Sequence, residues 1–406
     1  MTPEQQFFLD CLRDMFAGRI TEKPLLSEEP DIGLDPAVLY HISEGHSLSG
    51  VIYAQCMDWL RADSNFQHSF LSDVALSANR KYLLKEIGTK FFEEGIPFIC
   101  MKGSIFRDYW PIPELREMGD MDLVIRHRDR EKLDQIMMDL GYRKMVDNHA
   151  VWTYWMGPFM FELHDVMFYE ELANRFDYRK YFQRVWDTAV ERPVSGVQLP
   201  NMYVPEDNLH FLYLMAHTAK HIINKGSGFR AYLDMIYYCR NQNLDWKYLE
   251  KELAELQLLD FTRTCFSLCE RWFGVKMPLS QGNLENGFYE TVTMKTFHDG
   301  IFGLENKEEN HGASSAKAIK RAHLPYWLRA VTLSIQRLFP PYSVMQLTPW
   351  YSWIDGKPWL MPAAWVYRWC YVIAHKRNEG MDLLKEPFTE KDIIEKRESL
   401  ISDWGL

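Results

Sequence analysis

Two aspartates at the start of an apolar run constrain this 406-residue chain more than any other feature. Asp120 and Asp122 are separated by one residue and lead directly into the apolar residues 123–125. Side chains two residues apart in a strand point to the same face, so the two carboxylates would lie together and repel each other. Mg²⁺ prefers oxygen ligands and would neutralise such a pair. The pattern therefore predicts a buried, rigid strand that holds a divalent cation.

A second acidic strand is predicted further along the chain, in the run FMFELHD. Glu162 and His164 share one face of this strand, whereas Asp165 falls on the other face. Glu162 is therefore the candidate for a third carboxylate. In the alternative interpretation, Asp120 only turns the chain after Gly119, and Glu162 is a solvated strand residue. A D-x-D pair alone is a weak signal, but the Gly-Ser pair upstream and the glutamate downstream favour the metal site.

Hydrophobic periodicity divides the chain into four regions. Helical spacing dominates at first, then gives way to short apolar segments in the order strand, strand, helix, strand, strand, and returns from Asp207. These patterns predict an α+β protein in which a small mixed-sheet core is flanked by N-terminal and C-terminal helical regions. The predicted regions are an N-terminal helical region at 1–92, the α/β core at 93–204, a helical domain completing the cleft at 205–300, and an aromatic-rich helical region at 301–406, within which the polar segment 303–320 is expected to be mobile.

Charge and cysteine usage limit the function classes. A net charge of −10 and a pI near 5.8 argue against broad, non-specific nucleic-acid binding. The seven cysteines are scattered and form no C-x-x-C pair, so neither a zinc site nor a disulfide framework is predicted. The N-terminus lacks the basic start and apolar core of a signal peptide, and no run of about 18 apolar residues predicts a membrane span. We therefore expect a cytoplasmic protein.

The stretch MKGSIFRDYWPIPELREMGDMDLVI resembles the nucleotidyltransferase superfamily, whose pattern is a Gly-Gly or Gly-Ser pair, a spacer and two aspartates around an apolar residue. It is most similar to a poorly characterised bacterial branch of the DNA polymerase beta-like superfamily, which has the run LKG…R..GDIDLLV…LGY…ELH. The resemblance covers about residues 95–240 well and places Glu162 at the third carboxylate. Two departures are a slightly longer spacer between Ser104 and Asp120, which is usual in this branch, and Cys100 in place of an aliphatic residue.

The resemblance implies an enzyme of the EC 2.7.7 type. Mg²⁺, or Mn²⁺ in its place, held by Asp120, Asp122 and Glu162 would neutralise the triphosphate of an NTP. An acceptor hydroxyl would attack the α-phosphorus in line, and pyrophosphate would leave. ATP is one candidate donor, although the sequence does not name the NTP. The acceptor is expected to be a small molecule, a peptide or a protein rather than a large RNA, because the chain is acidic.

Phosphate ligands are expected at the Gly-Ser turn that precedes the aspartates. The resemblance implies that the Gly103-Ser104 turn brings backbone N–H groups and a hydroxyl to the β- and γ-phosphates, since glycine allows close approach. Lys102 and Arg116 are further candidate phosphate partners. The alternatives are that Lys102 is a solvated lysine at a strand end and that Arg116 pairs with Glu114 or Asp120.

Histidines recur on one face of the predicted helix NLHFLYLMAHTAKHII. The H-x-x-x-H spacing of His217 and His221 would suit zinc, but no glutamate base stands between them and no third ligand is obvious. The resembled family also has an H..KH helix followed by an R…D pair. On this resemblance, His217, Lys220, His221 and Asp234 line the nucleotide or acceptor side of the cleft. The alternative is that histidines of this helix are core or interdomain residues, and His210 is expected to be exposed.

The C-terminal region contains an aromatic cluster rich in proline. The preferred interpretation is that its aromatic side chains pack onto the helical domain. The alternative is a surface that lies on a membrane or binds a partner, although basic residues are sparse for strong attraction to anionic lipid. The cluster contains tryptophans at positions 350, 353, 359, 365 and 369.

Two other functions remain as alternatives. The first is a non-catalytic module that senses a nucleotide or assembles a complex. The intact D-x-D pair and its glutamate argue against it, because a site that has lost its activity is expected to lose carboxylates first. The second is a toxin-like transferase that acts on tRNA or protein.

Overall fold

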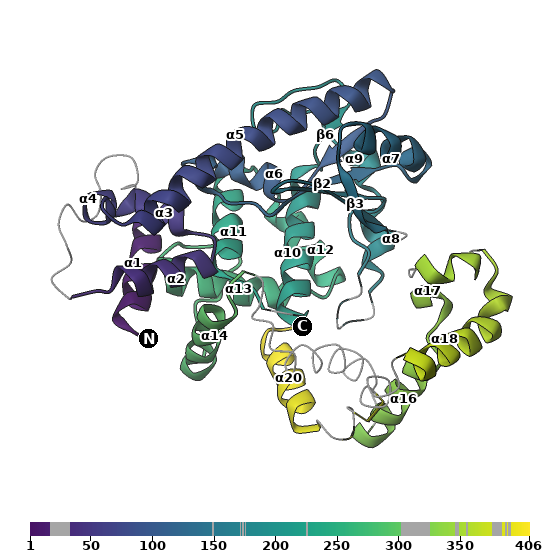
Figure 1. Ribbon diagram of the computed structural model, residues 1–406. Helices are drawn as coiled ribbons and strands as arrows, with labels where there is room; N and C mark the ends of the chain where they lie inside the picture. The colour runs from purple at the N-terminus through teal and green to yellow at the C-terminus, as the bar shows by residue number, and fades with distance from the viewer. Residues whose placement is uncertain are drawn as a thin grey trace.

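A six-stranded mixed sheet lies at the centre of the protein in the computed structural model (Figure 1). Its strands are β1 (Phe98–Cys100), β2 (Asp120–Ile125), β3 (Arg143–Asp147), β4 (Val151–Met156), β5 (Phe159–His164) and β6 (Met202–Tyr203). In space they follow the order β3-β4-β5-β2-β1-β6. β2 pairs in parallel with β5 and antiparallel with β1, whereas β1 pairs in parallel with β6. The predicted α+β class is confirmed.

The structure describes most of the chain. The predicted mobile segment 303–320 lies outside the described residues. These are 1–16, 33–147, 150–170, 172, 174, 176–224, 226–301, 325–345, 349–354, 356–375, 384–385, 388 and 391–406.

Two strands that the sequence did not predict complete the sheet at its edges. β3 pairs with β4, and its register shifts between Lys144 and Val146. β6 has only two residues and pairs with β1. Neither strand has a long alternation of apolar and polar residues, which is the signal that predicts strands from sequence. The four predicted strands and the helix between them are present.

Helices flank the sheet in three groups. The N-terminal group is α1 (Pro3–Met15), α2 (Pro36–Gly45), α3 (Ser49–Gln55), α4 (Met57–Leu60) and α5 (Ser64–Glu93). Within the core lie α6 (Gly103–Phe106), η1 (Arg107–Tyr109), η2 (Pro113–Leu115), η3 (His127–Asp129), α7 (Arg130–Asp139), α8 (Tyr178–Phe182) and α9 (Val185–Thr188). The third group is α10 (Asp207–Asn224), α11 (Phe229–Asn241), α12 (Trp246–Glu255), α13 (Leu259–Phe273) and α14 (Asn286–Asp299).

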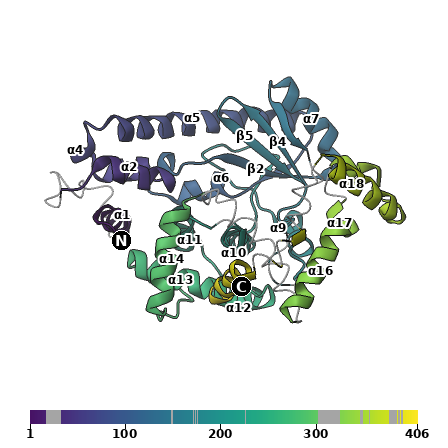
Figure 2. The same ribbon diagram turned by 60° about the horizontal axis from the view of Figure 1, so that its bottom comes forward.

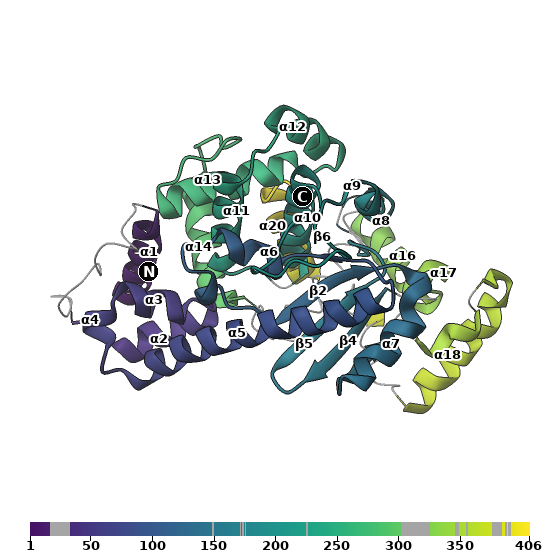
Figure 3. The same ribbon diagram turned by 90° about the horizontal axis from the view of Figure 1, so that it is seen from above.

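The two faces of the sheet are buried against different helices. Figures 2 and 3 show α5 and α7 on one side of the sheet and α10 to α13 on the other. Met121, Leu123 and Ile125 of β2 join the apolar cluster formed with α5 and α7. Val124 joins the second cluster, which includes residues of α10 and α11. Because alternate residues of a strand share a face, Asp122 projects toward the α10 side together with Val124.

The N-terminal helices also contribute to this second cluster. Phe8 and Leu12 of α1 are buried with Trp272 and Phe273 of α13. α1 begins with a capping box in which the side chains of Thr2 and Gln5 each bond the other's backbone. The first and third helical groups therefore share one hydrophobic core, while the predicted domain boundaries stay a prediction.

The C-terminal region contains a short second unit, here called the aromatic arm and defined as the described residues of 325–375. It has its own small apolar cluster, to which Met345, Ile354 and Met361 belong. The predicted packing of the aromatic run onto the helical domain is wrong for the exposed tryptophans 350, 353 and 359. The elements of this region are α16 (Tyr326–Leu338), α17 (Tyr342–Met345), η4 (Pro349–Ile354), η5 (Pro358–Leu360), α18 (Met361–His375) and, beyond the arm, α20 (Lys391–Asp403).

Candidate nucleotidyltransferase site

The parallel pairing of β2 with β5 brings acidic residues from two strands side by side. In the register of these strands Asp122 lies opposite Glu162, and Val124 lies opposite His164. Asp122 is buried in the sheet, whereas the side chain of Glu162 is 25% exposed to solvent. The structure therefore brings Asp122 and Glu162 together on one face of the sheet, and their role as ligands stays a prediction.

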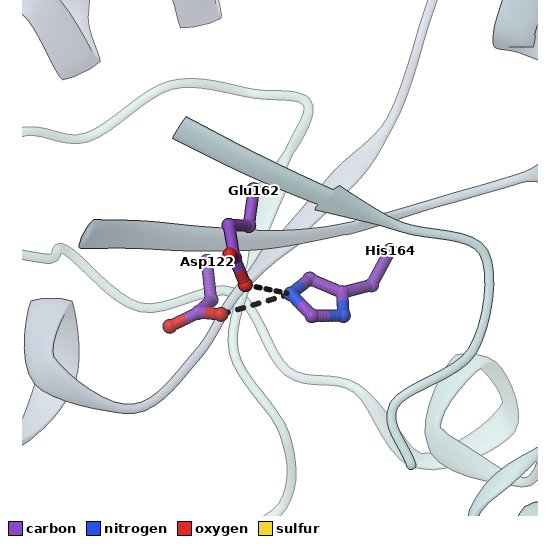
Figure 4. Close-up of side chains that lie close together, drawn as sticks. All are labelled: Asp122, Glu162 and His164. Atoms are coloured by element: carbon purple, nitrogen blue, oxygen red, sulfur yellow. Dashed lines mark hydrogen bonds and ion pairs between the residues drawn. The ribbon is translucent and has the colours of Figure 1, made fainter. Parts of the chain in front are cut away.

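His164 completes a cluster with these two carboxylates. Its Nε2 lies 2.8 Å from Asp122 Oδ1 and 3.4 Å from Glu162 Oε2 (Figure 4). Ligand atoms of Asp122, Glu162 and His164 all lie within 4.8 Å of one another, which is close enough to hold one metal ion. The sequence placed His164 on the face of Glu162 but did not include it in the site. Asp165, by contrast, turns to the other side and lies 3.4 Å from His127.

Asp122 is the most heavily contacted carboxylate of the site. Its Oδ1 accepts hydrogen bonds from Lys102 and His164, but its buried Oδ2 has no hydrogen-bond partner among the described residues. Burial alone would raise the pKa of Asp122, but the cationic Lys102 and the hydrogen bond with His164 lower it below its usual value. Asp122 is therefore ionised and keeps one oxygen free for a further ligand.

Asp120 lies at the start of β2, and the charges of this cluster shift its pKa. Burial and the negative charge of Asp122 raise its pKa from 3.8 to about 6. The carboxyl of Glu162 raises it further, whereas Lys102 opposes the shift. This repulsion between neighbouring carboxylates is the feature that the sequence predicted for the aspartate pair. A bound cation would relieve it.

Lys102 directs its ammonium into the site from a strained turn. Its Nζ lies 2.7 Å from Asp122 Oδ1, and its side chain is 16% exposed. The backbone φ of Lys102 is +50°, a region that residues other than glycine rarely adopt. Burial would lower its pKa, but Asp122 raises the pKa well above the usual value. The alternative of a solvated lysine at a strand end is therefore wrong.

Gly103 and Ser104 form the first turn of α6, directly after Lys102. A Cβ atom on Gly103 would lie 2.6 Å from Arg116 Nη1 and 2.9 Å from Met118 Sδ, so the position has no room for a side chain. Ser104 is buried, and its Oγ has no hydrogen-bond partner among the described residues. The turn thus packs closely against the loop that precedes β2.

Arg116 and Asp234 bond to each other rather than to the carboxylate cluster. Arg116 donates from Nη2 to Asp234 Oδ2 at 2.7 Å and from Nε to Oδ1 at 3.2 Å, and Trp110 Nε1 donates to Oδ1 at 2.9 Å. Both partners are buried. The acidic partner of Arg116 is thus neither Glu114 nor Asp120, the two that the sequence offered.

Three arginines hold the backbone of the loop that leads into β2. Arg116 and Arg230 donate to the carbonyl oxygen of Glu117, and Arg80 donates to that of Met118. Sequence reasoning did not connect Arg80 with the site, because it lies in α5, far from the loop along the chain. Together these bonds fix the position from which Asp120 and Asp122 project.

The histidine face of α10 lies on the same side as the carboxylates. His217 Nε2 lies 3.3 Å from His221 Nε2, and Lys220 Nζ lies 3.0 Å from Glu170 Oε1. Burial lowers the pKa of His217, and the nearby positive charges of His221, Lys102 and Lys220 lower it further. The ring of His217 also stacks on Tyr213 of the same helix at a centroid distance of 5.5 Å.

His210, at the other end of α10, differs from the prediction. It was expected to be exposed, but its side chain is fully buried and stacks on Phe106 at a ring distance of 4.7 Å. Neither ring nitrogen has a hydrogen-bond partner among the described residues, and burial lowers the pKa to about 3. His210 is a neutral core residue because the inward face of α10 continues through it.

An α+β fold with acidic side chains on adjacent parallel strands, and a helix with His217, Lys220 and His221 on the same side of the sheet, agrees with the nucleotidyltransferase class. A family model described as an uncharacterised nucleotidyltransferase matches residues 34–274, more than half of the chain. The chain therefore belongs to this nucleotidyltransferase family. No curated protein and no solved structure matches the chain significantly.

Proposed function

We propose that the protein transfers a nucleoside monophosphate from an NTP to an acceptor hydroxyl, with metal-assisted in-line attack and release of pyrophosphate. The observation that carries this proposal is the cluster of Asp122, Glu162 and His164, whose ligand atoms converge within 4.8 Å. Family membership supports nucleotidyl transfer in general. The metal, the acceptor and the EC 2.7.7 type are parts of the proposal.

The residues of the cluster fit a divalent cation. Asp122 Oδ2 is buried without a hydrogen-bond partner among the described residues, and a buried anionic oxygen left in this way costs free energy unless a cation binds it. Asp122 and Glu162 would supply oxygen ligands of the kind that Mg²⁺ or Mn²⁺ prefers, and His164 would add a nitrogen. Asp120, which lies outside this group, is a further carboxylate at the start of β2. A bound cation would neutralise the triphosphate and make the acceptor hydroxyl easier to deprotonate.

The acidic residues of the chain have separate tasks in this proposal. Glu162 is the most accessible member of the cluster and would accept the proton of the acceptor hydroxyl or ligate the metal. Asp120, with a pKa of about 6 in the metal-free site, would lose its proton when positive charge arrives. In the metal-free site His164 Nε2 hydrogen-bonds Asp122 Oδ1, a bond that it would exchange for the metal.

Basic residues around the cluster would bind the nucleotide. Lys102 would contact a phosphate once its bond to Asp122 is exchanged, and Gly103 and Ser104 present the first N–H groups of α6. From α10, His217, Lys220 and His221 would contact phosphate or the acceptor. Arg116 and Asp234, which bond to each other, would serve the nucleotide by fixing the loop before β2.

Nucleotide binding with and without Mg²⁺ is the first test. We expect one NTP to stabilise the wild type in thermal shift and calorimetry only when Mg²⁺ is present, and Asp120→Asn/Asp122→Asn to abolish this effect. Asp165→Asn is the matched control, because this half-buried carboxylate lies next to His164 in sequence but faces His127. Metal-independent binding of every NTP, unchanged in the double variant, would contradict the proposal. Labelled NTP would then be used to screen small-molecule and protein acceptors.

A second candidate function is a non-catalytic nucleotide-binding module. The observation that favours it is the bond between Lys102 and Asp122, since an internal cation already neutralises this carboxylate. Such a module would bind a nucleotide without releasing pyrophosphate from it. Pyrophosphate release that depends on Asp122 would exclude this candidate. The toxin-like activity, ATP as donor and the cytoplasmic location stay predictions of the sequence.

A further inference from the structure

The tryptophans of the aromatic arm fall into two groups. Trp365 and Trp369 donate from Nε1 to the carbonyl oxygens of Pro340 and Leu338, and both rings pack edge-on against Phe339. These two residues hold α18 against the end of α16. Four others are exposed: Trp327 at 65%, Trp350 at 59%, Trp353 at 40% and Trp359 at 70%. Two tryptophans therefore hold the helices of the arm together, and the other four are exposed on its surface.

The exposed apolar side chains of α16 follow helical spacing. Trp327, Val331, Ile335 and Leu338 are separated by four, four and three residues, so they form one stripe along the helix, and each of them is exposed. In α18 the exposed Val366 and Ile373 are seven residues apart and share one face of that helix. A soluble helix normally buries such a stripe, so these two faces are suited to contact another apolar phase.

The charge of the arm is opposite to that of the rest of the chain. Residues 325–375 contain four arginines and lysines and one acidic residue, a net charge of +3, which leaves −13 on the remainder of a chain whose total is −10. Lys357 is exposed and lies in sequence between the exposed Trp353 and Trp359. Six of the 14 tryptophans of the chain are concentrated in this stretch.

We propose that the aromatic arm binds the surface of an anionic lipid bilayer. Tryptophan and tyrosine favour the boundary between lipid headgroups and hydrocarbon, and basic residues among them are attracted to anionic headgroups. The arm lies on the surface and does not cross it, because no helix among the described residues has the length and apolar composition of a membrane span.

Charge favours a lipid surface over a second copy of the arm. Arg329 of the arm is paired with Glu398 at 2.7 Å, which leaves about two of the three net positive charges. Two arms packed face to face would bring these charges together, whereas an anionic bilayer attracts each of them. Figures 1 and 3 show α16, α17 and α18 gathered at one end of the molecule, away from α1 to α4. This proposal does not depend on the proposed reaction.

Vesicle flotation of the full-length chain tests the proposal. The probes are vesicles of phosphatidylcholine mixed with phosphatidylglycerol, and vesicles of phosphatidylcholine alone. We expect the wild type to float with the anionic vesicles and more weakly with the neutral ones. The variant Trp350→Ala/Trp353→Ala/Trp359→Ala should lower the partition coefficient about tenfold or more. Lys357→Glu, which does not alter the aromatic side chains, should lower it about threefold to tenfold on anionic vesicles only.

The matched control removes three exposed aromatic side chains outside the arm. The variant Tyr82→Ala/Phe92→Ala/Trp155→Ala should float like the wild type, since these residues have similar exposure but lie in α5 and β4. Circular dichroism and thermal melts check that each variant is folded. No flotation of the wild type, or equal losses in the arm and control variants, would overturn the proposal. So would self-association that the arm variant abolishes, if no vesicle binding accompanies it.

Discussion

Asp122 and Asp234 are both buried aspartates beside a basic side chain, yet their oxygens are used differently. Both oxygens of Asp234 accept hydrogen bonds from Arg116, and Oδ1 also accepts one from Trp110. Asp122 accepts from Lys102 and His164 through Oδ1, whereas its buried Oδ2 has no partner among the described residues. A fully bonded buried carboxylate stabilises a fold, and a partly bonded one needs an explanation. We infer that the Asp234 pair is structural and that Asp122 binds a ligand.

The groups around Asp122 and Asp234 also differ: Asp122 has other carboxyl groups nearby, and Asp234 has hydrogen-bond donors. Asp122 stands close to Glu162, and burial together with the charge of Asp122 raises the pKa of Asp120 to about 6. Asp234 has an aromatic N–H and a guanidinium as its hydrogen-bond partners instead. Crowded carboxylates store electrostatic repulsion that only a cation or a proton relieves. Burial alone therefore does not mark a functional aspartate. A carboxylate oxygen without a hydrogen-bond partner, together with repulsion from neighbouring carboxylates, does.

Removing the acidic partner of the structural pair should have the largest effect on stability. Asp234→Ala is expected to lower the free energy of unfolding by about 3–5 kcal/mol, because Arg116 is left buried without a counter-ion. Urea denaturation followed by circular dichroism measures this change. The variant Arg116→Met/Asp234→Leu should lose less, since it leaves no unpaired charge. A loss below about 1 kcal/mol in Asp234→Ala would show that the Arg116–Asp234 pair does not stabilise the fold, and Asp234 would no longer contrast with Asp122.

The corresponding change at Asp122 should affect activity rather than stability. Asp122→Asn is expected to reduce pyrophosphate release about a thousandfold, roughly 4 kcal/mol of transition-state stabilisation, because the anionic ligand is lost. The folded state should persist, since an amide oxygen still accepts the bonds from Lys102 and His164. A coupled pyrophosphate assay and a thermal melt on the same preparation separate the two effects. Full activity in this variant would show that Asp122 is not a ligand.

The pH dependence of stability should report the repulsion at Asp120. Its pKa is raised from 3.8 to about 6 in the fold, so the folded state binds the proton more tightly than the unfolded state. This contribution is fully present below about pH 4 and is lost as the pH rises through 6, by up to about 3 kcal/mol. Urea denaturation at pH 4 to 8 without divalent cations should show this slope. Asp120→Asn should flatten it, and an unchanged slope would contradict the assignment.

The smallest expected effect tests how tightly the Gly-Ser turn packs on the structural pair. Gly103→Ala is expected to lower the free energy of unfolding by about 1–3 kcal/mol, because its Cβ would lie 2.6 Å from Arg116 Nη1. Arg116 cannot move aside without breaking its bonds to Asp234. Gly119→Ala is the matched control, since no atom lies within 4 Å of a Cβ at that position. Equal losses in the two variants would point to backbone entropy instead of contact.

Much of the candidate site could be predicted because its signals are local. The i, i+2 parity of Asp120 and Asp122, and of Glu162 and His164, is visible in the sequence and needs only that each segment is a strand. The role of His164 could not be predicted with the same ease. The sequence does not show which residue His164 contacts. That contact follows from the parallel pairing of β5 with β2, which places Val124 opposite His164 and Asp122 opposite Glu162.

Long-range contacts explain what the sequence left undecided or misjudged. Arg116 was expected to pair with an acidic neighbour in the chain, but its partner Asp234 is 118 residues away. His210 and the exposed tryptophans of the arm were misplaced for a related reason. Periodicity shows which residues share a face of a helix, but the neighbours packed against that face decide whether it is buried.

By itself, the sequence determined the secondary structure that places carboxylates on strand faces and bases on a helix face, because these patterns follow from backbone geometry over a few residues. Only the tertiary structure decided that β2 lies beside β5 and that Lys102 and His164 bond to the same oxygen of Asp122. It also decided that both oxygens of Asp234 accept hydrogen bonds from Arg116. These choices depend on contacts between distant segments, which bring groups together only after the chain has folded around its two cores.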